Sequence, residues 1–170
     1  MTVRRSEAQP GSAARQAGPA ALDETGLRLL RELQEDGRRS YAALAESVGL
    51  SEGAVRQRVK SMIESDVIQI VAIIDPLQLG FGVMAMVQLS AVGDARALAE
   101  RLGAIDEVVY CVLISGKYDL YLEVVCRDNE HLLSLVHDRI KGDEGVGEVE
   151  TAIYLRVHKQ TYNYVRVLDR

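Results

Sequence analysis

The sequence contains no tryptophan, one phenylalanine, three prolines and two cysteines among its 170 residues. It also has no run approaching the roughly 20 consecutive apolar residues that a membrane-spanning helix needs. Residues 1–21 include three arginines but no apolar segment behind them, so they are unlike a secretion signal, and we expect a disordered tail there. These absences predict a soluble, cytoplasmic protein.

Residues that commonly bind metals or carry catalysis are few and scattered. Cys111 and Cys126 lie in apolar, strand-like runs without CxxC spacing. Among the three histidines, His131 and His137 are six residues apart, a spacing that does not bring both rings to one helix face, and His158 stands alone. We therefore expect reduced core thiols, no metal site and no cofactor. No nucleophile, base and orienting group share a predicted site, so an enzyme is not expected.

Charge is unevenly distributed along the chain, whose net charge is −5. Residues 1–21 have three basic residues and one acid, residues 22–65 have seven against eight, and residues 66–170 have ten against sixteen. Because the total is acidic, binding to nucleic acid can only be argued from local geometry. The length and this division predict two small domains.

The nearly neutral segment is predicted to form three helices. The first follows Asp23 as its N-cap and closes at Gly37. Its leucines Leu27, Leu30 and Leu33 recur at near-helical spacing.

The second and third helices are joined by a very short turn. Ser40 stands at an N-cap position before the second helix, and Ser51 stands before the third. The helices must therefore cross closely, which requires a small residue such as Ala45 at their contact. Gly49 provides the left-handed turn and Val55 the buried anchor, a spacing that predicts a helix-turn-helix. A plain helical hairpin is the alternative.

The third helix is amphipathic, with apolar residues at i, i+4, i+7 and i+8: Val55, Val59, Met62 and Ile63. Small, polar and cationic residues occupy the opposite side and its edges. Together with the two N-cap serines they form the predicted DNA-binding set: Ser40, Ser51, Gly53, Ala54, Arg56, Gln57, Arg58, Lys60 and Ser61.

This surface suits the major groove of DNA. Gly53 and Ala54 allow close approach, and Gln57 can address an adenine edge. Arg56 and Arg58 suit phosphates. A solvated amphipathic helix is the alternative interpretation.

Residues 81–170 alternate between strand-like and helical patterns. The runs in chain order are VMAMVQLSAV, DARALAERLGAI, VVYCVLISG, DLYLEVVCR, NEHLLSLVHDRIKG and VETAIYLRVHKQ. The order βαββαβ predicts a four-stranded antiparallel sheet with both helices on one face, a ferredoxin-like arrangement. The whole chain is therefore expected to be α+β, with a helix-turn-helix domain before this second domain.

The face of that sheet opposite the helices is not polar. If the helices cover Val83, Ala85 and Val87, then Met84 and Met86 remain outside, and the reverse choice exposes the other three. Apolar surface of this kind needs cover, so we expect at least a homodimer.

Residues 66–80, between the two domains, are too apolar for a free linker. Ile68, Ile70 and Ala72 alternate with Gln69 in a strand-like pattern. We expect a hinge strand that packs or pairs with a second copy of the chain.

The tetrapeptide Gly116-Lys117-Tyr118-Asp119 joins two strands predicted as a hairpin. It sets an aromatic ring and a carboxylate at a sheet end. An acid there can hold an ammonium group while nearby backbone amides hold a carboxylate, as a free amino acid requires. An ordinary structural turn is the alternative.

From Leu22 onward, the sequence resembles the Lrp/AsnC (feast/famine) family of prokaryotic transcription regulators. The resemblance rests on LDETGLRLLRELQEDGRRSYAALAESVGLSEGAVRQRVKSMIESDVIQIVAIIDP and on GKYDLYLEV. It implies a helix-turn-helix, a hinge strand and a RAM-type βαββαβ effector domain that dimerises through its sheet and often assembles to octamers. It also implies effectors, commonly amino acids, near Gly116, Tyr118 and Asp119, with Thr151 and Ile153 approaching a neighbouring site.

These patterns predict a sequence-specific DNA-binding transcription regulator, associated with the nucleoid, that responds to a small effector such as an amino acid. Its expected partners are double-stranded DNA, that effector and further copies of the chain. An amino-acid-binding regulatory subunit acting through a protein partner is the alternative. The spacing from Gly49 to Ser61 favours DNA.

Overall fold

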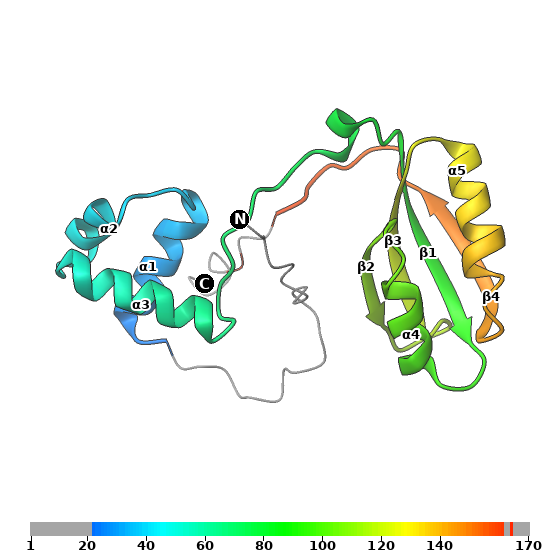
Figure 1. Cartoon of the computed structure of the whole chain (residues 1–170), viewed down its shortest axis with the longest axis horizontal. Helices are drawn as coiled ribbons and strands as arrows, with labels where there is room; N and C mark the ends of the chain where they lie inside the picture. Colours follow the sequence, from blue (N-terminus) through cyan, green and yellow to red (C-terminus); the bar gives the residue numbers. More distant parts are fainter. Residues whose placement is uncertain (1–21, 162–163, 165–170) are drawn as a thin grey trace, which may run out of the picture. The chain divides into compact units, whose positions relative to one another are not determined.

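The computed structural model describes residues 22–161 and Tyr164, so the predicted tail, residues 1–21, lies outside the described residues. Three α-helices come first, and a βαββαβ succession follows a short 3-10 turn (Figure 1). Within the described part of the chain, no helix is long and apolar enough to cross a membrane.

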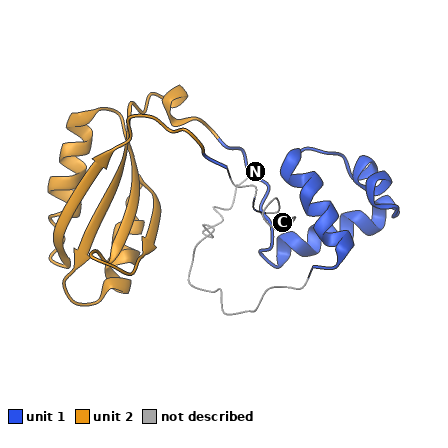
Figure 2. Cartoon of the chain, turned by 180° about the vertical axis from the view of Figure 1, so that it is seen from behind, with its two compact units in different colours: residues 1–73, 160–170 blue, residues 74–159 orange. Residues whose placement is uncertain are grey.

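The chain divides into two compact units (Figure 2). Of the described residues, the first unit contains those up to Ile73 together with Gln160, Thr161 and Tyr164, and the second is Ile74–Lys159. The division thus falls inside the predicted hinge, residues 66–80.

The first unit contains three helices: α1 (Glu24–Glu35), α2 (Tyr41–Val48) and α3 (Glu52–Glu64). Each follows a predicted N-cap whose side chain accepts a backbone hydrogen bond, at 2.7 Å for Asp23 and 3.2 Å for both Ser40 and Ser51. These bonds satisfy N–H groups that the first helical turn leaves unpaired.

The turn between α2 and α3 has the predicted helix-turn-helix geometry. Gly49 adopts a left-handed conformation with φ of 71°, and its N–H donates to the carbonyl of Ala45. Ala45 is buried where the helices meet, and Val55 is completely buried. Each position therefore has the role that its spacing predicted.

The core of the first unit is small: Leu29, Leu44, Ala45, Val55, Val59 and Met62. The predicted leucine face of α1 is partly wrong. Leu29 is completely buried and Leu33 packs against the core, whereas Leu27 and Leu30 are only half-buried. The helix packs through the side that contains the buried Gly26, and it ends at Glu35 rather than at Gly37.

Residues 66–80 form no strand in the single chain. Val67 and Ile68 pack against the core of the first unit, and Pro76–Leu79 form the 3-10 turn η1. Four apolar side chains between them are more than half exposed: Ile70, Val71, Ile73 and Ile74. A strand needs a ladder partner, and the described chain offers none to this segment. Pairing with a second copy stays a prediction.

The second unit has the predicted order: β1 (Val83–Ala91), α4 (Ala95–Gly103), β2 (Val108–Leu113), β3 (Leu120–Cys126), α5 (Asn129–Ser134), the π-helical turn η2 (Leu135–Ile140) and β4 (Val146–Ile153). The strands form one sheet in the order β2-β3-β1-β4, and every neighbouring pair is antiparallel. Both helices lie on one face of this sheet (Figure 1). The ferredoxin-like prediction is confirmed.

The helices cover the face that contains Ala85, Val87 and Leu89, which are completely buried. Because side chains alternate along a strand, Met84 and Met86 lie on the other face, which we call the open sheet face. Cys126 is buried and Cys111 half-buried; both are free thiols, and burial raises the pKa of each.

The open sheet face is more mixed than predicted. Tyr110 and Tyr121 pack edge to face with ring centroids 5.9 Å apart, and the hydroxyls of Tyr121 and Tyr154 are 2.7 Å apart. Glu123 stands directly opposite Met86 in the ladder. Aromatic and sulfur-containing side chains therefore share this face with a carboxylate.

Candidate functional site

The side of α3 that faces away from the core is exposed throughout. All seven predicted helix residues there are exposed: Gly53, Ala54, Arg56, Gln57, Arg58, Lys60 and Ser61. Gln57 has no hydrogen-bond partner among the described residues, so its amide is available to a base edge. The structure thus places these seven residues on one exposed side of α3, whereas the other two predicted residues, Ser40 and Ser51, cap α2 and α3.

Arg56 is held between the starts of α2 and α3. Its guanidinium carbon lies 4.6 Å from the ring centroid of Tyr41, a cation–π contact, and its Nη2 atom lies 2.8 Å from Oε1 of Glu52. The first turns of both helices also carry the positive ends of their dipoles. A cation in this place suits a phosphate group.

Arg58 pairs with Asp23, the N-cap residue of α1. Its Nη1 atom lies 2.8 Å from Oδ2 and 3.0 Å from Oδ1 of Asp23. The backbone N–H of Gly26 and then the Arg58 guanidinium lower the pKa of Asp23. Lys60 pairs more loosely with Glu64, at 3.5 Å. Both cations remain partly exposed and therefore accessible to DNA phosphates.

Sequence reasoning missed the partners of these cations. The i,i+4 spacing of Glu52 and Arg56 could have indicated their pair. No local signal indicates the pair of Asp23 and Arg58, which are 35 residues apart. The contact of Arg56 with Tyr41 likewise depends on how α2 and α3 cross.

The Gly116-to-Asp119 turn is closed by backbone hydrogen bonds. Gly116 has φ of 151°, a conformation that side chains disfavour. The N–H of Ile114 donates to the carbonyl of Asp119 at 2.8 Å. The turn lies at the end of the ladder in which Leu113 pairs with Leu120.

Asp119 is bound to the end of β1. Its Oδ2 atom accepts a hydrogen bond of 2.8 Å from the N–H of Ala91, and its own N–H donates to the carbonyl of Leu89 at 3.0 Å. Oδ1 has no hydrogen-bond partner among the residues the structure describes. One carboxylate oxygen is therefore structural, and the other remains available to an ammonium group.

Tyr118 connects the turn to β4. Its side chain is buried, and its hydroxyl donates to Oε2 of Glu150 at 2.7 Å. Lys117 donates to the same hydroxyl at 2.9 Å, and this hydrogen bond raises the pKa of Lys117. Glu150 and Lys117 were not predicted, although both belong to the polar surroundings of the turn.

Thr151 and Ile153 are exposed on the edge strand β4, opposite Val87 and Ala85. Alternation places them on the other side of the strand from Glu150. The single chain therefore does not bring them to Tyr118.

A helix-turn-helix whose exposed α3 carries three cations, in one chain with a ferredoxin-like domain, defines a two-domain DNA-binding regulator. Residues 22–63 match the family model of the AsnC-type helix-turn-helix domain, and residues 83–164 match that of the Lrp/AsnC ligand binding domain. The chain belongs to the Lrp/AsnC family. It is a helix-turn-helix transcriptional regulator with a ligand-binding domain and not an enzyme.

Two relatives support this assignment. An uncharacterised HTH-type transcriptional regulator of Pyrococcus furiosus is 34% identical over 148 residues, which cover 86% of this chain and 99% of that protein. The transcriptional regulator AzlB of Bacillus subtilis is 30% identical over 145 residues, which cover 82% of this chain and 92% of that protein.

Solved structures are similar over most of the chain. A transcriptional regulator of Neisseria meningitidis in complex with L-Met has a TM-score of 0.76 at 26% identity, covering 83% of this chain and 94% of that chain. A feast or famine regulatory protein of M. tuberculosis complexed with L-methionine has a TM-score of 0.79 at 28% identity. The similarity covers 85% of this chain and 99% of that chain.

Proposed function

We propose that the chain binds specific DNA sequences through α3 and that an amino acid, bound near the Gly116-to-Asp119 turn, changes this binding. The observation that carries the DNA part is the unpaired Gln57 amide beside the close-approach residues Gly53 and Ala54. Arg56, Arg58 and Lys60 supply positive charge around it.

The effector part rests on the free Oδ1 atom of Asp119 and on two similar solved structures. The similar regulators of Neisseria meningitidis and M. tuberculosis were solved in complex with L-methionine. An amino acid has one positive group, and a carboxylate oxygen without a partner is its natural acceptor. Thr151 and Ile153 of a second copy would complete the site.

The proposed assembly is a homodimer through the open sheet face, with further association to an octamer. Tyr110, Tyr121 and the two methionines offer apolar and aromatic surface for a second copy. A regulator of this kind acts in the cytoplasm on the nucleoid.

Genomic footprinting with and without single amino acids tests the proposal. Discrete protected sites whose occupancy changes with one amino acid are expected. Binding without any preferred sites would contradict the DNA part and favour a regulatory subunit for a protein partner. Preferred sites with no response to any of the twenty amino acids would contradict only the effector part.

A further inference from the structure

Glu52 is the first residue of α3, and it does not belong to the predicted DNA-binding set. It is exposed together with Gly53 and Ala54, the two small residues that follow it. When a helix-turn-helix binds DNA, the N-terminal residues of its second helix contact base edges in the major groove. Glu52 therefore lies at the end of α3 that approaches the bases most closely.

The carboxylate of Glu52 is held on one side only. Its Oε1 atom accepts a hydrogen bond of 2.8 Å from Nη2 of Arg56, whose guanidinium carbon lies 4.6 Å from the ring centroid of Tyr41. Its Oε2 atom accepts no hydrogen bond from the residues that the structure describes. A guanidinium has several N–H donors, so Arg56 can contact a phosphate without releasing Glu52. One oxygen of Glu52 thus remains available to a donor outside the chain.

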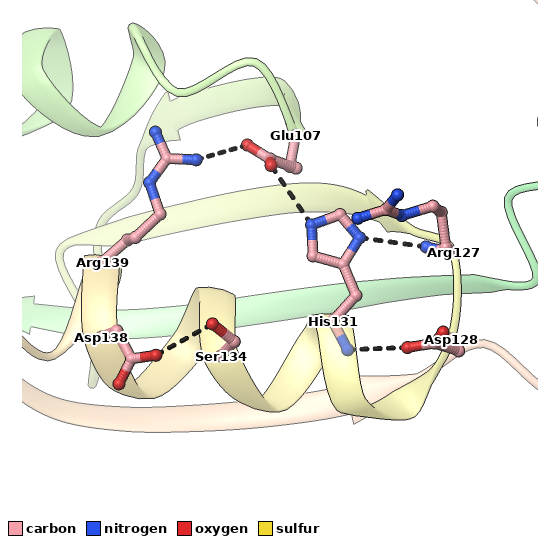
Figure 3. A network of polar contacts seen from close by, with 7 residues as sticks. All are labelled: Glu107, Arg127, Asp128, His131, Ser134, Asp138 and Arg139. Carbon is pink, nitrogen blue, oxygen red and sulfur yellow. Dashed lines mark hydrogen bonds and ion pairs between the residues drawn. The ribbon is translucent and has the colours of Figure 1, made fainter.

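The pair of Glu52 and Arg56 contributes little to the stability of the fold. The two side chains are 52% and 59% exposed, and both belong to α3. Exposed pairs within one helix are weak. The second unit contains a pair of another kind, because Glu107 is only 21% exposed and contacts His131 and Arg139, which are 24 and 32 residues away (Figure 3). Glu107 connects separate elements, whereas Glu52 connects none.

A carboxylate distinguishes the four bases by the groups that they present in the major groove. Guanine and thymine present acceptors there, and adenine presents an acceptor beside its amino group. Cytosine presents an amino donor and no acceptor. Because a carboxylate can only accept and is repelled by the phosphates, Glu52 is favourable on DNA only where a base donates to it.

We propose that Glu52 reads a cytosine in the major groove and disfavours sequences without a cytosine at that position. This inference rests on the proposed function, in which α3 enters the groove. Arg56 offsets the charge of Glu52 on every sequence alike, so the preference for cytosine comes from Glu52 itself. Gln57, five residues further along α3, addresses a separate base.

Selection from a randomised DNA library by the full-length wild type, Glu52→Ala and Glu64→Ala tests this role. Glu64 is the matched control, because it is the last residue of α3, is exposed and pairs with Lys60 within the same helix at 3.5 Å. Both substitutions remove one negative charge. Wild type and Glu64→Ala should select sites that share a cytosine, whereas Glu52→Ala should accept any base at that position. Retention of every selected cytosine by Glu52→Ala would overturn the proposal.

Affinities for one selected site and for the same site with thymine in place of that cytosine supply the second test. Wild type and Glu64→Ala should lose about tenfold or more on the exchange, and Glu52→Ala should lose less than about threefold. Glu52→Gln should also tolerate thymine, because its amide can donate to the thymine oxygen.

The outcomes separate this inference from the proposed function. Selected sites whose base preferences are the same for wild type and both Glu52 variants would show that the proposal is wrong and leave sequence-specific binding through α3 intact. A wild type that selects no sites would contradict the DNA part of the proposed function and the role of Glu52 with it.

Discussion

The guanidinium of Arg58 on α3 lies 2.8 Å from the carboxylate of Asp23, the residue that caps α1. One side chain of α3 therefore holds the start of another helix. Asp23 accepts hydrogen bonds both from that guanidinium and from the N–H of Gly26. Because the Arg58 side chain is still 43% exposed, it can serve the fold and a phosphate at once.

Arg58→Ala should lower both DNA affinity and the stability of the first unit. We expect weaker binding to all sequences, with a salt dependence reduced by about one phosphate contact. We also expect a melting temperature lower by a few degrees at neutral pH, since exposed ion pairs are weak. Salt-dependent binding and thermal unfolding measure the two effects.

The pH dependence of that stability effect follows from the lowered pKa of Asp23. A carboxyl group with a depressed folded-state pKa stabilises the protein above its ordinary value of about 4, and this contribution disappears as pH falls through the depressed value. The difference between wild type and Arg58→Ala should therefore shrink in acid. A difference that stays constant down to the lowest pH at which both remain folded would show that the ion pair is not its cause.

Gln57→Ala should relax base preference, whereas Arg56→Ala should weaken binding to all sequences alike. A well-placed amide contact to an adenine discriminates by about 1–3 kcal/mol, while a phosphate contact carries no sequence information. Selection from a randomised DNA library, followed by affinity for selected and random DNA, measures both. Equal losses on both kinds of DNA for the two variants would remove the role assigned to Gln57.

The helix-turn-helix could be predicted from sequence because each of its requirements is local. Ala45, Gly49, Ser51 and Val55 have roles that depend on neighbours within ten residues. The face of α1 could not be placed in this way, because which side packs is decided by α2 and α3. Leu29 is buried for that reason, although its leucine neighbours satisfy a helical period equally well.

Met86→Glu should dissociate the proposed dimer. Met86 lies on the open sheet face directly opposite Glu123, so the variant places two carboxylates side by side in the surface that a second copy would cover. Light scattering at micromolar concentration should show a shift toward monomer, with circular dichroism unchanged. Arg96→Glu, on α4, is the control, and its oligomer should have the same mass in solution as the wild-type oligomer. An unchanged mass for Met86→Glu would contradict dimerisation through this face.

Asp143→Asn should destabilise the second unit. Both oxygens of Asp143 accept hydrogen bonds of 2.8 Å from Arg101, and the N–H of Gly145 donates to Oδ1 at 2.8 Å. The Arg101 guanidinium and then that N–H lower the pKa of Asp143 to about 2. Since the pair is partly exposed, we expect a loss of about 1 kcal/mol in the free energy of unfolding.

Urea unfolding at several pH values measures that loss. The stabilisation by Asp143 is complete above its unfolded pKa of about 4 and is lost as pH falls toward 2, so the variant should approach wild type in acid. Glu144→Gln removes a neighbouring charge and is the control. A loss no larger than that of the control would contradict the assigned role.

The order βαββαβ was predictable because each element has its own periodicity, but contacts across the sheet were not. The bond between Asp119 and Ala91 joins residues 28 apart, and that between Tyr118 and Glu150 joins residues 32 apart. Both depend on the strand order, which places β1 between β3 and β4. From sequence, Asp119 could only be a turn acid or a ligand group; the structure gives one of its oxygens a structural partner.

The substitutions Asp119→Ala and Asp119→Asn separate those two roles. The alanine variant loses both the charge and the acceptor for the Ala91 N–H, whereas asparagine keeps an acceptor oxygen and loses only the charge. If Asp119 holds the effector's ammonium group, both variants lose the response. If it only fixes the end of β1, alanine lowers stability with the response preserved, and asparagine behaves like wild type.

We expect Asp119→Ala and Asp119→Asn alike to abolish the effect of the amino acid on DNA binding. Effector-free DNA binding should stay within about tenfold of wild type, roughly 1.4 kcal/mol, because α3 belongs to the other unit. An unpaired ammonium in a partly desolvated cleft costs several kcal/mol, so ligand affinity should fall steeply. Because coupling is reciprocal, an effector that weakens DNA binding must itself bind less well to the wild-type DNA complex. Isothermal titration of a panel of amino acids against wild type and both variants measures this, and undiminished affinity in Asp119→Asn would mean that the ammonium group has another partner.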